Sequence, residues 1–436
     1  MTKLNRAITG YGLTMVAIGS CIGSGIFLTP SQIAGHLPSP LLILLVWAIG
    51  GLITLTGAVT FAELGGMFPR AGGVYVYLKE AYGEMFGFLY GWAYLLVINS
   101  GAIAALSLTF AKYLDFLFPL GGVGIQAAAV LVILGVTAVN IARVKAGEIF
   151  SNIFTGLKLV GIMGIVVIGL LKGNHQPGLL ISAPGGTGGN IAGAFGLALI
   201  GVLWSYGGWQ HASYLAGETK NPQRNVPWAM IIGSAAVSGI YLLINLAYLF
   251  LLPVKEMATS KSVAADAVKT VFPWGADLIA VIIAVSVLGT AGIYTLSAPR
   301  IYYAMAEDRL FFKSLARVHQ RWRTPIRAIL FQSAWAVILL LSWGTFEDII
   351  AYVVFTDWIF FCLTAGAIFI FRYNRKSTNR PYKTAGYPVT PLLFMVIVIF
   401  FIANTLIEKP RQAWAGLIFM VIGIGVFYFF RRKKGG

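Results

Sequence analysis

Two ionisable side chains stand inside long apolar runs of the sequence. Lys158 lies in NIFTGLKLVGIM and Asp357 in YVVFTDWIFFC. A charged group in hydrocarbon is costly unless it is paired, neutral or hydrated, so such residues are functional candidates by default. The alternative is a structural polar contact inside a helix bundle. For Lys158 we favour a functional role, and for Asp357 a functional and a structural role are equally favoured.

Two glycine-rich stretches interrupt other apolar runs. The first is GSCIGSGIF (residues 19–27), and the second is LWSYGGWQ (residues 203–210). Dense glycine disfavours a continuous helix, although small residues also allow close helix packing. Such interruptions at corresponding positions of two halves indicate the binding site of a transporter. We therefore predict two broken helices.

The predicted breaks would expose main-chain groups near the middle of the bilayer. Ser24 and Trp204 lie about 20 to 24 Å from the ends at which their apolar runs begin, at 1.5 Å per residue. Broken backbone is tolerated there only where it lines a cavity or packs against protein. Freed N–H groups can bind a carboxylate and freed C=O groups an ammonium. A zwitterionic α-amino acid presents both groups.

Other reactive residue types form no recognisable site. Cys21 and Cys362 lie inside apolar runs, so they predict neither a disulfide framework nor a metal site. His211 follows the second break, where an ordinary hydrogen-bonded histidine is the simpler interpretation. The remaining histidines fall in expected loops and show no ligand spacing. We expect no metal, no cofactor and no enzymatic activity; the loop histidines are His36, His175 and His319.

The elements that position these residues are membrane-spanning helices. The 436 residues are 58% hydrophobic and 11% charged, about half the charged fraction of a soluble domain, which excludes an ordinary soluble enzyme. A span needs about 20 apolar residues. The sequence contains twelve such runs, at residues 8–28, 41–67, 84–110, 125–142, 150–171, 191–216, 229–252, 276–305, 328–343, 349–371, 389–407 and 413–430.

The net charge of +17 predicts an orientation rather than nucleic-acid binding. With twelve spans, both termini lie on one side, and most of the basic residues fall in segments on that side, including residues 300–327 and 431–434. The positive-inside rule makes that side cytoplasmic. Glu218, Arg6 and Arg70 on that side are candidates for an inner gate, or else ordinary solvated residues. The basic residues expected outside are Lys112, Lys172, Lys255, Lys261, Lys269, Lys409 and Arg411.

Four motifs resemble the amino acid–polyamine–organocation superfamily, and within it the bacterial relatives of the L-type amino acid transporter family. They are IGSCIGSGIFLTP (18–30), FPRAGGVYVYLKEAYG (68–83), LWSYGGWQ followed by GETKNPQRNVP (217–227), and APRIYYAMAEDRLFFKSLARVH (298–319). Their order and spacing together are highly specific, and the resemblance covers nearly the whole chain.

The resemblance implies an all-α membrane protein of 12 transmembrane helices, forming one polytopic transporter domain over residues 1–436. Helices 1 and 6 would be unwound within a LeuT-like five-plus-five inverted repeat. The first repeat would span residues 8–171 and the second residues 191–371, with two peripheral helices at residues 389–430.

The resemblance also implies a substrate site. In relatives, the glycine-rich unwound segment holds the substrate carboxylate, main-chain carbonyls hold the ammonium, and an aromatic side chain covers the substrate. The lysine of the fifth span resembles a substitute for the sodium ion of sodium-coupled cousins, which makes sodium dependence unexpected. The positions here are Ser20, Ser24 and Gly25 for the carboxylate, Cys21, Trp204, Ser205 and Gly207 for the ammonium, Trp204 for the aromatic cover, and Lys158 for sodium.

Three departures from family patterns bear on function. Gln210 replaces the acidic residue of arginine/agmatine antiporters, and Asp357 replaces a common asparagine of L-type relatives. Residues 115–125 lack the cysteine that links animal members to a glycoprotein heavy chain, which implies a stand-alone carrier. Selectivity would come from side chains near Trp204, Val353, Phe355 and Asp357, and Gln210 is predicted as a further substrate-binding residue.

These observations together predict a secondary active transporter of neutral L-amino acids in a bacterial cytoplasmic membrane. It would work by sodium-independent alternating access, with exchange favoured and proton-coupled symport as the alternative. From a different class, an ion channel also fits glycine-rich spans and buried charges. The amino acid that is carried and the mode of coupling remain open at this stage.

Overall fold

The computed structural model describes residues 4–174, 191–342 and 346–434, and over these ranges the chain is helical. The first half runs from α1 to α8. Its elements are α1 (Gly10–Cys21), α2 (Gly25–His36), α3 (Pro40–Met67), α4 (Val74–Tyr82), α5 (Glu84–Ala93), a π-helical turn η1 (Tyr94–Ile98), α6 (Asn99–Leu117), α7 (Gly121–Ala142) and α8 (Val144–Lys172).

The second half begins with another interrupted helix and ends with the long helices α18 and α19. Its elements are α9 (Ile191–Tyr206), α10 (His211–Tyr214), a short 3-10 turn η2 (Ala216–Glu218), α11 (Pro222–Leu251), α12 (Val254–Thr259), α13 (Val263–Lys269), α14 (Gly275–Ser297), α15 (Pro299–Glu307), a second 3-10 turn η3 (Lys313–Ala316), α16 (Ile326–Ser342), α17 (Phe346–Asn374), α18 (Val389–Glu408) and α19 (Pro410–Lys434).

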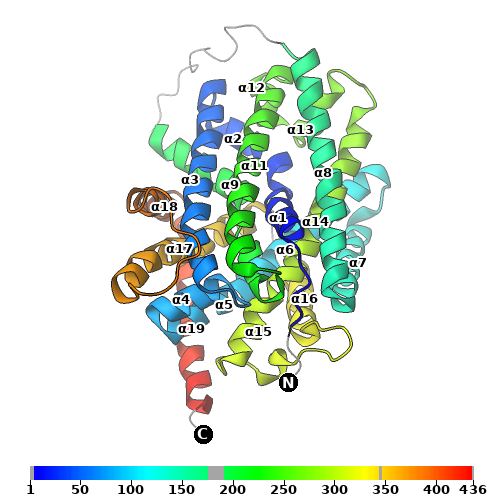
Figure 1. Cartoon of the computed structure of the whole chain (residues 1–436). Coiled ribbons are helices and arrows are strands. Elements are labelled where there is room, and N and C mark those ends of the chain that lie inside the picture. Colours follow the sequence, from blue (N-terminus) through cyan, green and yellow to red (C-terminus); the bar gives the residue numbers. More distant parts are fainter. Residues whose placement is uncertain (1–3, 175–190, 343–345, 435–436) are drawn as a thin grey trace.

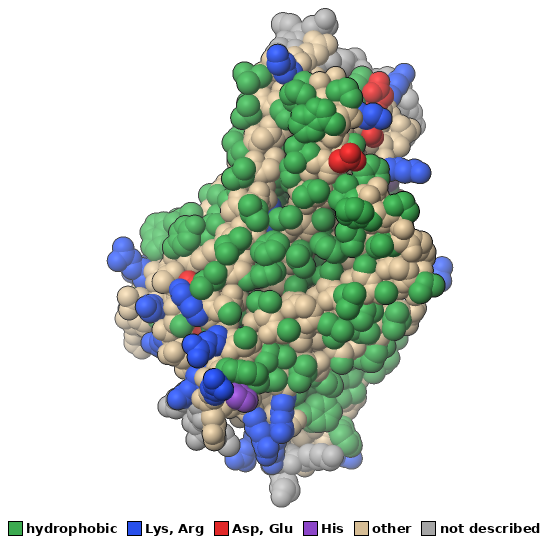
Figure 2. Space-filling model, turned by 90° about the vertical axis from the view of Figure 1, so that its right-hand side faces the viewer, with side chains coloured by type: hydrophobic (Ala, Val, Ile, Leu, Met, Phe, Trp, Pro, Cys, Tyr) green, Lys and Arg blue, Asp and Glu red, His purple; other side chains and the backbone are tan. Residues whose placement is uncertain are grey.

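Ten helical stretches of the described chain are long and apolar enough to cross a membrane. Two shorter apolar helices, α9 and α16, stand where the sixth and ninth runs are expected. The first stretch extends to His36, beyond the predicted end at residue 28, because Pro30 sits within α2 without ending it. Hydrophobic side chains form a broad belt between two charged ends (Figure 2). The chain is therefore a multi-pass membrane protein.

Helix α1 lies at the centre of the molecule and packs against α8, α11 and α14. Around it, α11 packs along α3, and α14 packs against α6 and α8. Nine of the twelve residues of α1 are buried, so its surface is covered by protein rather than lipid. Both chain ends lie at the same end of the molecule (Figure 1).

At that end, the segment before α1 forms main-chain hydrogen bonds with the segment between α10 and α11. Ile8 forms an isolated parallel bridge with Thr219, through main-chain hydrogen bonds of 2.9 Å to Glu218 and Lys220. Beside it, Glu218 accepts two hydrogen bonds from the guanidinium of Arg300, at 2.6 and 3.0 Å. Both side chains of this ion pair are fully buried.

Candidate functional site

The first predicted helix break is confirmed. Helix α1 ends at Cys21 and α2 begins at Gly25, with three non-helical residues between them. A helix end leaves its last carbonyl groups without intrahelical partners. The break therefore presents main-chain acceptors in the middle of the protein, where water does not replace the lost hydrogen bonds.

Lys158 of α8 satisfies these acceptors. Its Nζ atom donates to the carbonyl oxygens of Gly19 at 3.0 Å and Ile22 at 2.6 Å. It also donates to Oγ1 of Thr290 at 2.7 Å. The side chain is fully buried, and an ammonium group has three donors, so all three are used. The partners of this buried cation are thus carbonyl and hydroxyl groups rather than a carboxylate.

The second predicted break is also confirmed, and it touches the first. Helix α9 ends at Tyr206, and α10 begins only at His211. Gly208 between them has φ 131°, a left-handed conformation that favours glycine. The Oγ atom of Ser20 donates to the carbonyl of Gly208 at 2.8 Å. A Cβ atom on Gly208 would lie 2.5 Å from the backbone of Ser20, so glycine is required for this contact.

Further contacts join the two breaks. The hydroxyl of Tyr241 in α11 lies 2.9 Å from the carbonyl oxygens of both Cys21 and Ser205. A Cβ atom on Gly25 would lie 2.5 Å from Oγ of Ser205. The sequence predictions missed Tyr241 and Thr290, because a lone tyrosine or threonine in an apolar run does not differ from the many that make no such contact.

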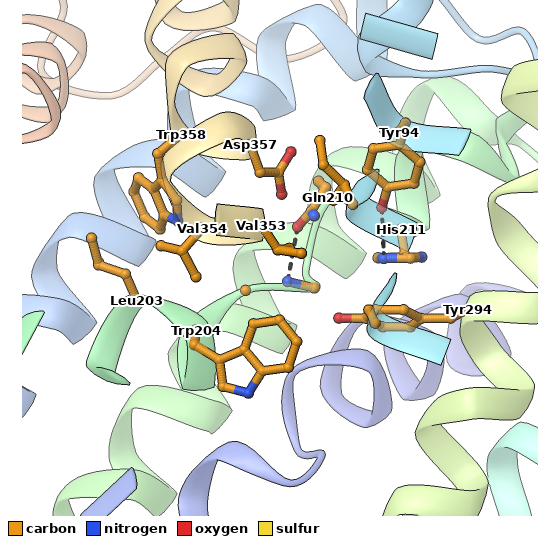
Figure 3. A pocket seen from close by; sticks show the side chains of 14 residues that line it. Tyr94, Leu203, Trp204, Gln210, His211, Tyr294, Val353, Val354, Asp357 and Trp358 are labelled. Carbon is orange, nitrogen blue, oxygen red and sulfur yellow. Dashed lines mark hydrogen bonds between the residues drawn. The ribbon is translucent and has the colours of Figure 1, made fainter. Parts of the chain in front are cut away.

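A small cavity lies beside the breaks. Its volume is about 30 Å³, room for about two water molecules, so an amino acid does not fit in it in this conformation. Figure 3 shows Trp204 and Asp357 on opposite sides of Val353. Five predicted residues line the cavity: Trp204, Gly207, Gln210, Val353 and Asp357. The others are Tyr94, Ile98, Ala102, Leu203, Gly208, His211, Tyr294, Val354 and Trp358.

The carboxyl group of Asp357 is buried in this wall, with 8% of the residue exposed. Its Oδ1 atom has no hydrogen-bond partner among the described residues. Buried polar atoms are rarely left unpaired in proteins, and an exception indicates a ligand, a water or another role. Asp357 is not a partner of Lys158, whose hydrogen bonds go to α1, the first break and α14.

His211 is a hydrogen-bonded member of the opposite wall, as the simpler interpretation predicted. Its Nε2 atom lies 2.9 Å from the hydroxyl of Tyr94, and its Nδ1 atom 2.5 Å from Oγ of Ser297. Its ring stacks on Tyr294 at a centroid distance of 4.1 Å, as Figure 3 shows. No group of three or more potential metal ligands occurs among the described His, Cys, Asp and Glu residues.

Phe355 was predicted to contribute to selectivity, but it does not line the cavity. Val353, Val354, Asp357 and Trp358 share one face of α17, whereas Phe355 is two residues from Val353 and so about 200° around the helix. A methyl group on Gly416 of α19 would lie 3.3 Å from its ring.

The other predicted residues, Ser20, Cys21, Ser24, Gly25 and Ser205, belong to the two breaks or the residues flanking them rather than to the cavity wall.

The chain matches known transporters over nearly its whole length. A model of the amino acid permease family matches residues 8–427. The serine/threonine exchanger SteT of Bacillus subtilis (strain 168) is 33% identical, covering 97% of this chain and 96% of the relative. The b(0,+)-type amino acid transporter 1 of Homo sapiens is 32% identical, covering 98% and 88%. The large neutral amino acids transporter small subunit 2 of Mus musculus is 30% identical, covering 95% and 78%.

Proposed function

The chain belongs to the amino acid permease family, and from this premise we propose that it exchanges neutral L-amino acids across a membrane, without sodium, by alternating access. The observation that carries the proposal is the contact between two broken helices beside a small cavity. A substrate that bridges both breaks would stabilise an occluded state more than the open states, which is what a carrier requires.

The α-carboxylate of the substrate binds at the start of α2. The N-terminus of a helix presents free N–H groups and a positive dipole end, which favour an anion. Ser24 and Gly25 stand at this position, and Oγ of Ser24 is buried with no hydrogen-bond partner among the residues that the structure describes. Ser20 is held by Gly208 and so connects the carboxylate end of the site to the second break.

The ammonium group binds the main-chain carbonyls at the breaks. The candidates are the carbonyls of Cys21, Trp204, Ser205 and Gly207, which stand where α1 and α9 end. Tyr241 lies against two of them and so fixes their direction. Because these carbonyls bind the ammonium group, which all α-amino acids share, they do not select among side chains.

Lys158 replaces a bound sodium ion. Its ammonium group donates to two carbonyls of the first break, the type of ligand that a hard cation takes from a protein. A covalently attached positive charge at this position removes the need for a mobile one. Transport is therefore expected to be independent of sodium.

Selectivity depends on the cavity wall that faces the breaks. Trp204 supplies the aromatic cover, Val353 an apolar surface, and Gln210 and Asp357 polar groups. The names of the relatives, a serine/threonine exchanger and a large neutral amino acid transporter, support neutral substrates. The unpartnered Oδ1 atom of Asp357 favours a substrate side chain that donates a hydrogen bond.

The proposed topology has 12 spans and both termini in the cytoplasm of a bacterium. Its support is the pair of short helices α9 and α16 beside ten longer stretches, the common end that holds both termini, and the basic segments there. The first five spans (residues 8–171) and the next five (residues 191–371) form the inverted repeat, with residues 389–430 peripheral. The cysteines, Cys21 and Cys362, lie in spans, which supports a carrier without a disulfide-linked partner.

The decisive experiment uses purified protein in liposomes and a panel of labelled amino acids. We expect uptake of neutral amino acids that requires a preloaded interior and is unchanged when sodium is replaced by choline. Uptake driven into empty liposomes by a pH gradient would establish proton symport instead. Ion currents without any amino acid uptake would establish a channel.

A matched pair of variants tests the site. Trp204→Ala removes the proposed cover of the substrate and is expected to abolish most exchange. Trp274→Ala removes an exposed tryptophan at the N-terminal end of α14 and is expected to leave exchange unchanged. Equal kinetics of the two variants would remove Trp204 from the site.

A further inference from the structure

A second, larger cavity lies at the end of the molecule away from both termini, the end where α12 and α13 are seen in Figure 1. Its volume is about 750 Å³, within the range of small-molecule sites. It is lined by the middle of α2, by the C-terminal part of α6, by residues 260–269 around α13, and by the start of α14. None of the predicted site residues lines it.

The two cavities lie in series along the same helix. Ala102 of α6 lines the small central cavity, and Thr109 of the same helix lines the large one. Seven residues of helix correspond to about 10 Å of rise. The large cavity is therefore about one amino acid length further out than the proposed central site.

The difference in volume decides which cavity can receive a solute in this conformation. The central cavity has about 30 Å³ and the outer one about 750 Å³. In this conformation, the outer cavity has room for an amino acid and the central cavity does not.

The charge of the outer cavity is predominantly positive. Lys112, Lys261 and Lys269 line it, against one acidic residue, Asp266. The carboxylate of Asp266 accepts a hydrogen bond of 2.6 Å from Ser260. Across the described chain, no carboxylate forms an ion pair with any of the three lysines. Within the described residues, these three ammonium groups therefore have no carboxylate oxygen within 4 Å.

Hydroxyl groups add neutral hydrogen-bonding capacity to this wall. Ser31, Thr109, Tyr113 and Ser262 line the cavity. Thr109 donates to the carbonyl of Ala105 at 2.8 Å and Tyr113 to the hydroxyl of Ser262 at 3.2 Å, which leaves Ser31 and Ser262 as hydroxyl donors for a ligand. Ammonium and hydroxyl donors together suit the oxygen atoms of a carboxylate. A cleft lined by one sign of charge also raises the local concentration of oppositely charged solutes and repels like charges.

We propose that the outer cavity is a second, low-affinity site that binds the carboxylate of an approaching amino acid and disfavours amino acids of net positive charge. The role in transport rests on the proposed function, whereas the binding of a carboxylate does not. The outer cavity selects amino acids by net charge before the central site selects among their side chains.

The test compares two triple variants with the same change of charge at the same proposed face. The cavity variant is Lys112→Gln, Lys261→Gln, Lys269→Gln. The control variant is Lys172→Gln, Lys255→Gln, Lys409→Gln, whose positions do not line the cavity. Inhibition of labelled threonine uptake by unlabelled arginine is measured in right-side-out vesicles, at ionic strengths of about 0.01 and 0.15 M, where the Debye length is about 30 and 8 Å.

In the cavity variant, we expect arginine to inhibit at a concentration about 10-fold lower than in the wild type at low ionic strength, the lower end of electrostatic steering effects. The difference shrinks at the higher ionic strength. In the control variant, inhibition stays near the wild-type value. Equal shifts in both variants, or no shift in either, would overturn the charge selection.

A second measurement does not depend on transport. Thermal unfolding of the purified protein is followed with succinate as the probe, against sodium chloride of equal ionic strength. Succinate is expected to raise the unfolding temperature of the wild type and the control variant but not that of the cavity variant. If the wild type takes up no amino acid but shows this pattern, the proposed function fails and the carboxylate site remains. If succinate stabilises all three proteins equally, the carboxylate site is refuted.

Discussion

Lys158 is a buried cation whose partners are uncharged. Its three hydrogen bonds go to two carbonyls and one hydroxyl, and each carbonyl exists as a free acceptor because α1 stops at Cys21. The lysine and the helix break therefore stabilise each other. Without the break, the ammonium group would lose carbonyl acceptors, and without the lysine, the carbonyls would lose a donor. A buried polar group that is left unpaired carries its full desolvation cost.

Replacing Lys158 by methionine is expected to abolish exchange while the protein still inserts in the membrane. The substitution keeps an unbranched chain but removes the ammonium donor of the first break, whose carbonyls then keep only the hydroxyls of Thr290 and Ser286 within reach. A buried acceptor that is left unpaired costs about 1–3 kcal/mol. Exchange of labelled threonine in liposomes and the thermal unfolding temperature are the measurements. Lys172→Met at the exposed end of the same helix serves as the control and should alter neither. Normal exchange by Lys158→Met would show that the ammonium group is dispensable.

Asp357 distinguishes exchange from proton symport. In an exchanger, Asp357→Asn keeps the size and polarity of the side chain, so exchange continues with an altered preference among amino acids. Neither protein should then respond to a pH gradient across empty liposomes. If a pH gradient drives uptake by the wild type, and Asp357→Asn loses that uptake but keeps exchange, then Asp357 carries the proton and the exchanger proposal is wrong.

At the scale of elements, the site consists of two helix ends held against each other. Gly208 contacts the backbone of Ser20 so closely that a side chain does not fit, and Tyr241 of α11 lies against a carbonyl from each helix. The broken helices are thus one packed unit, and a change in one break is transmitted directly to the other.

Gly208→Ala is expected to reduce exchange at least as strongly as the loss of Trp204. The added Cβ atom would lie 2.5 Å from Ser20, at a φ of 131° that L-residues rarely adopt. Exchange rate and unfolding temperature measure the effect.

Gly239→Ala in α11 is the matched control, because a Cβ atom there meets nothing within 4 Å. That change should be neutral or stabilise the protein by about 0.5–1 kcal/mol, since glycine is unfavourable within a helix. Wild-type exchange by Gly208→Ala would refute the close contact between the breaks.

At the scale of the whole molecule, the two ends are built differently. The end that holds the termini is closed by the bridge between Ile8 and Thr219 and by the buried pair of Glu218 and Arg300. The opposite end contains the large cavity. Of the three candidates for an inner gate, Glu218 has this buried partner, whereas Arg70 forms a half-exposed pair with Glu80.

The Glu218–Arg300 pair is expected to couple strongly in a double-mutant cycle. Glu218→Gln leaves a buried guanidinium without its carboxylate and should destabilise the protein by about 3–5 kcal/mol. Adding Arg300→Met to the same chain removes the orphaned charge and should recover part of that loss. Arg70→Gln, at an exposed pair, should cost at most about 1 kcal/mol. Strictly additive effects of Glu218→Gln and Arg300→Met would show that the pair does not act as a unit.

Much of the candidate site follows from local sequence. Dense glycine predicted both helix breaks, because chain conformation depends on the nearest residues. Lys158 stood out because any charge in an apolar run is exceptional. In contrast, the contacts of Tyr241 and Thr290 join residues far apart in the chain. Sequence also does not state which face of α17 meets the cavity, and Phe355 does not line it.

The sequence by itself determined that this protein is helical, lies in a membrane and has two interrupted helices, because hydrophobicity and helix propensity are properties of short segments. Only the tertiary structure decided that the two breaks touch and that Lys158 binds the first of them, whereas Asp357 lines the small cavity beside the breaks. The tertiary structure alone also showed the second, lysine-lined cavity nearer the end of the molecule. Those relations depend on how the helices pack in space. Packing brings together side chains that are far apart along the chain, and their spacing in the sequence does not predict the contact.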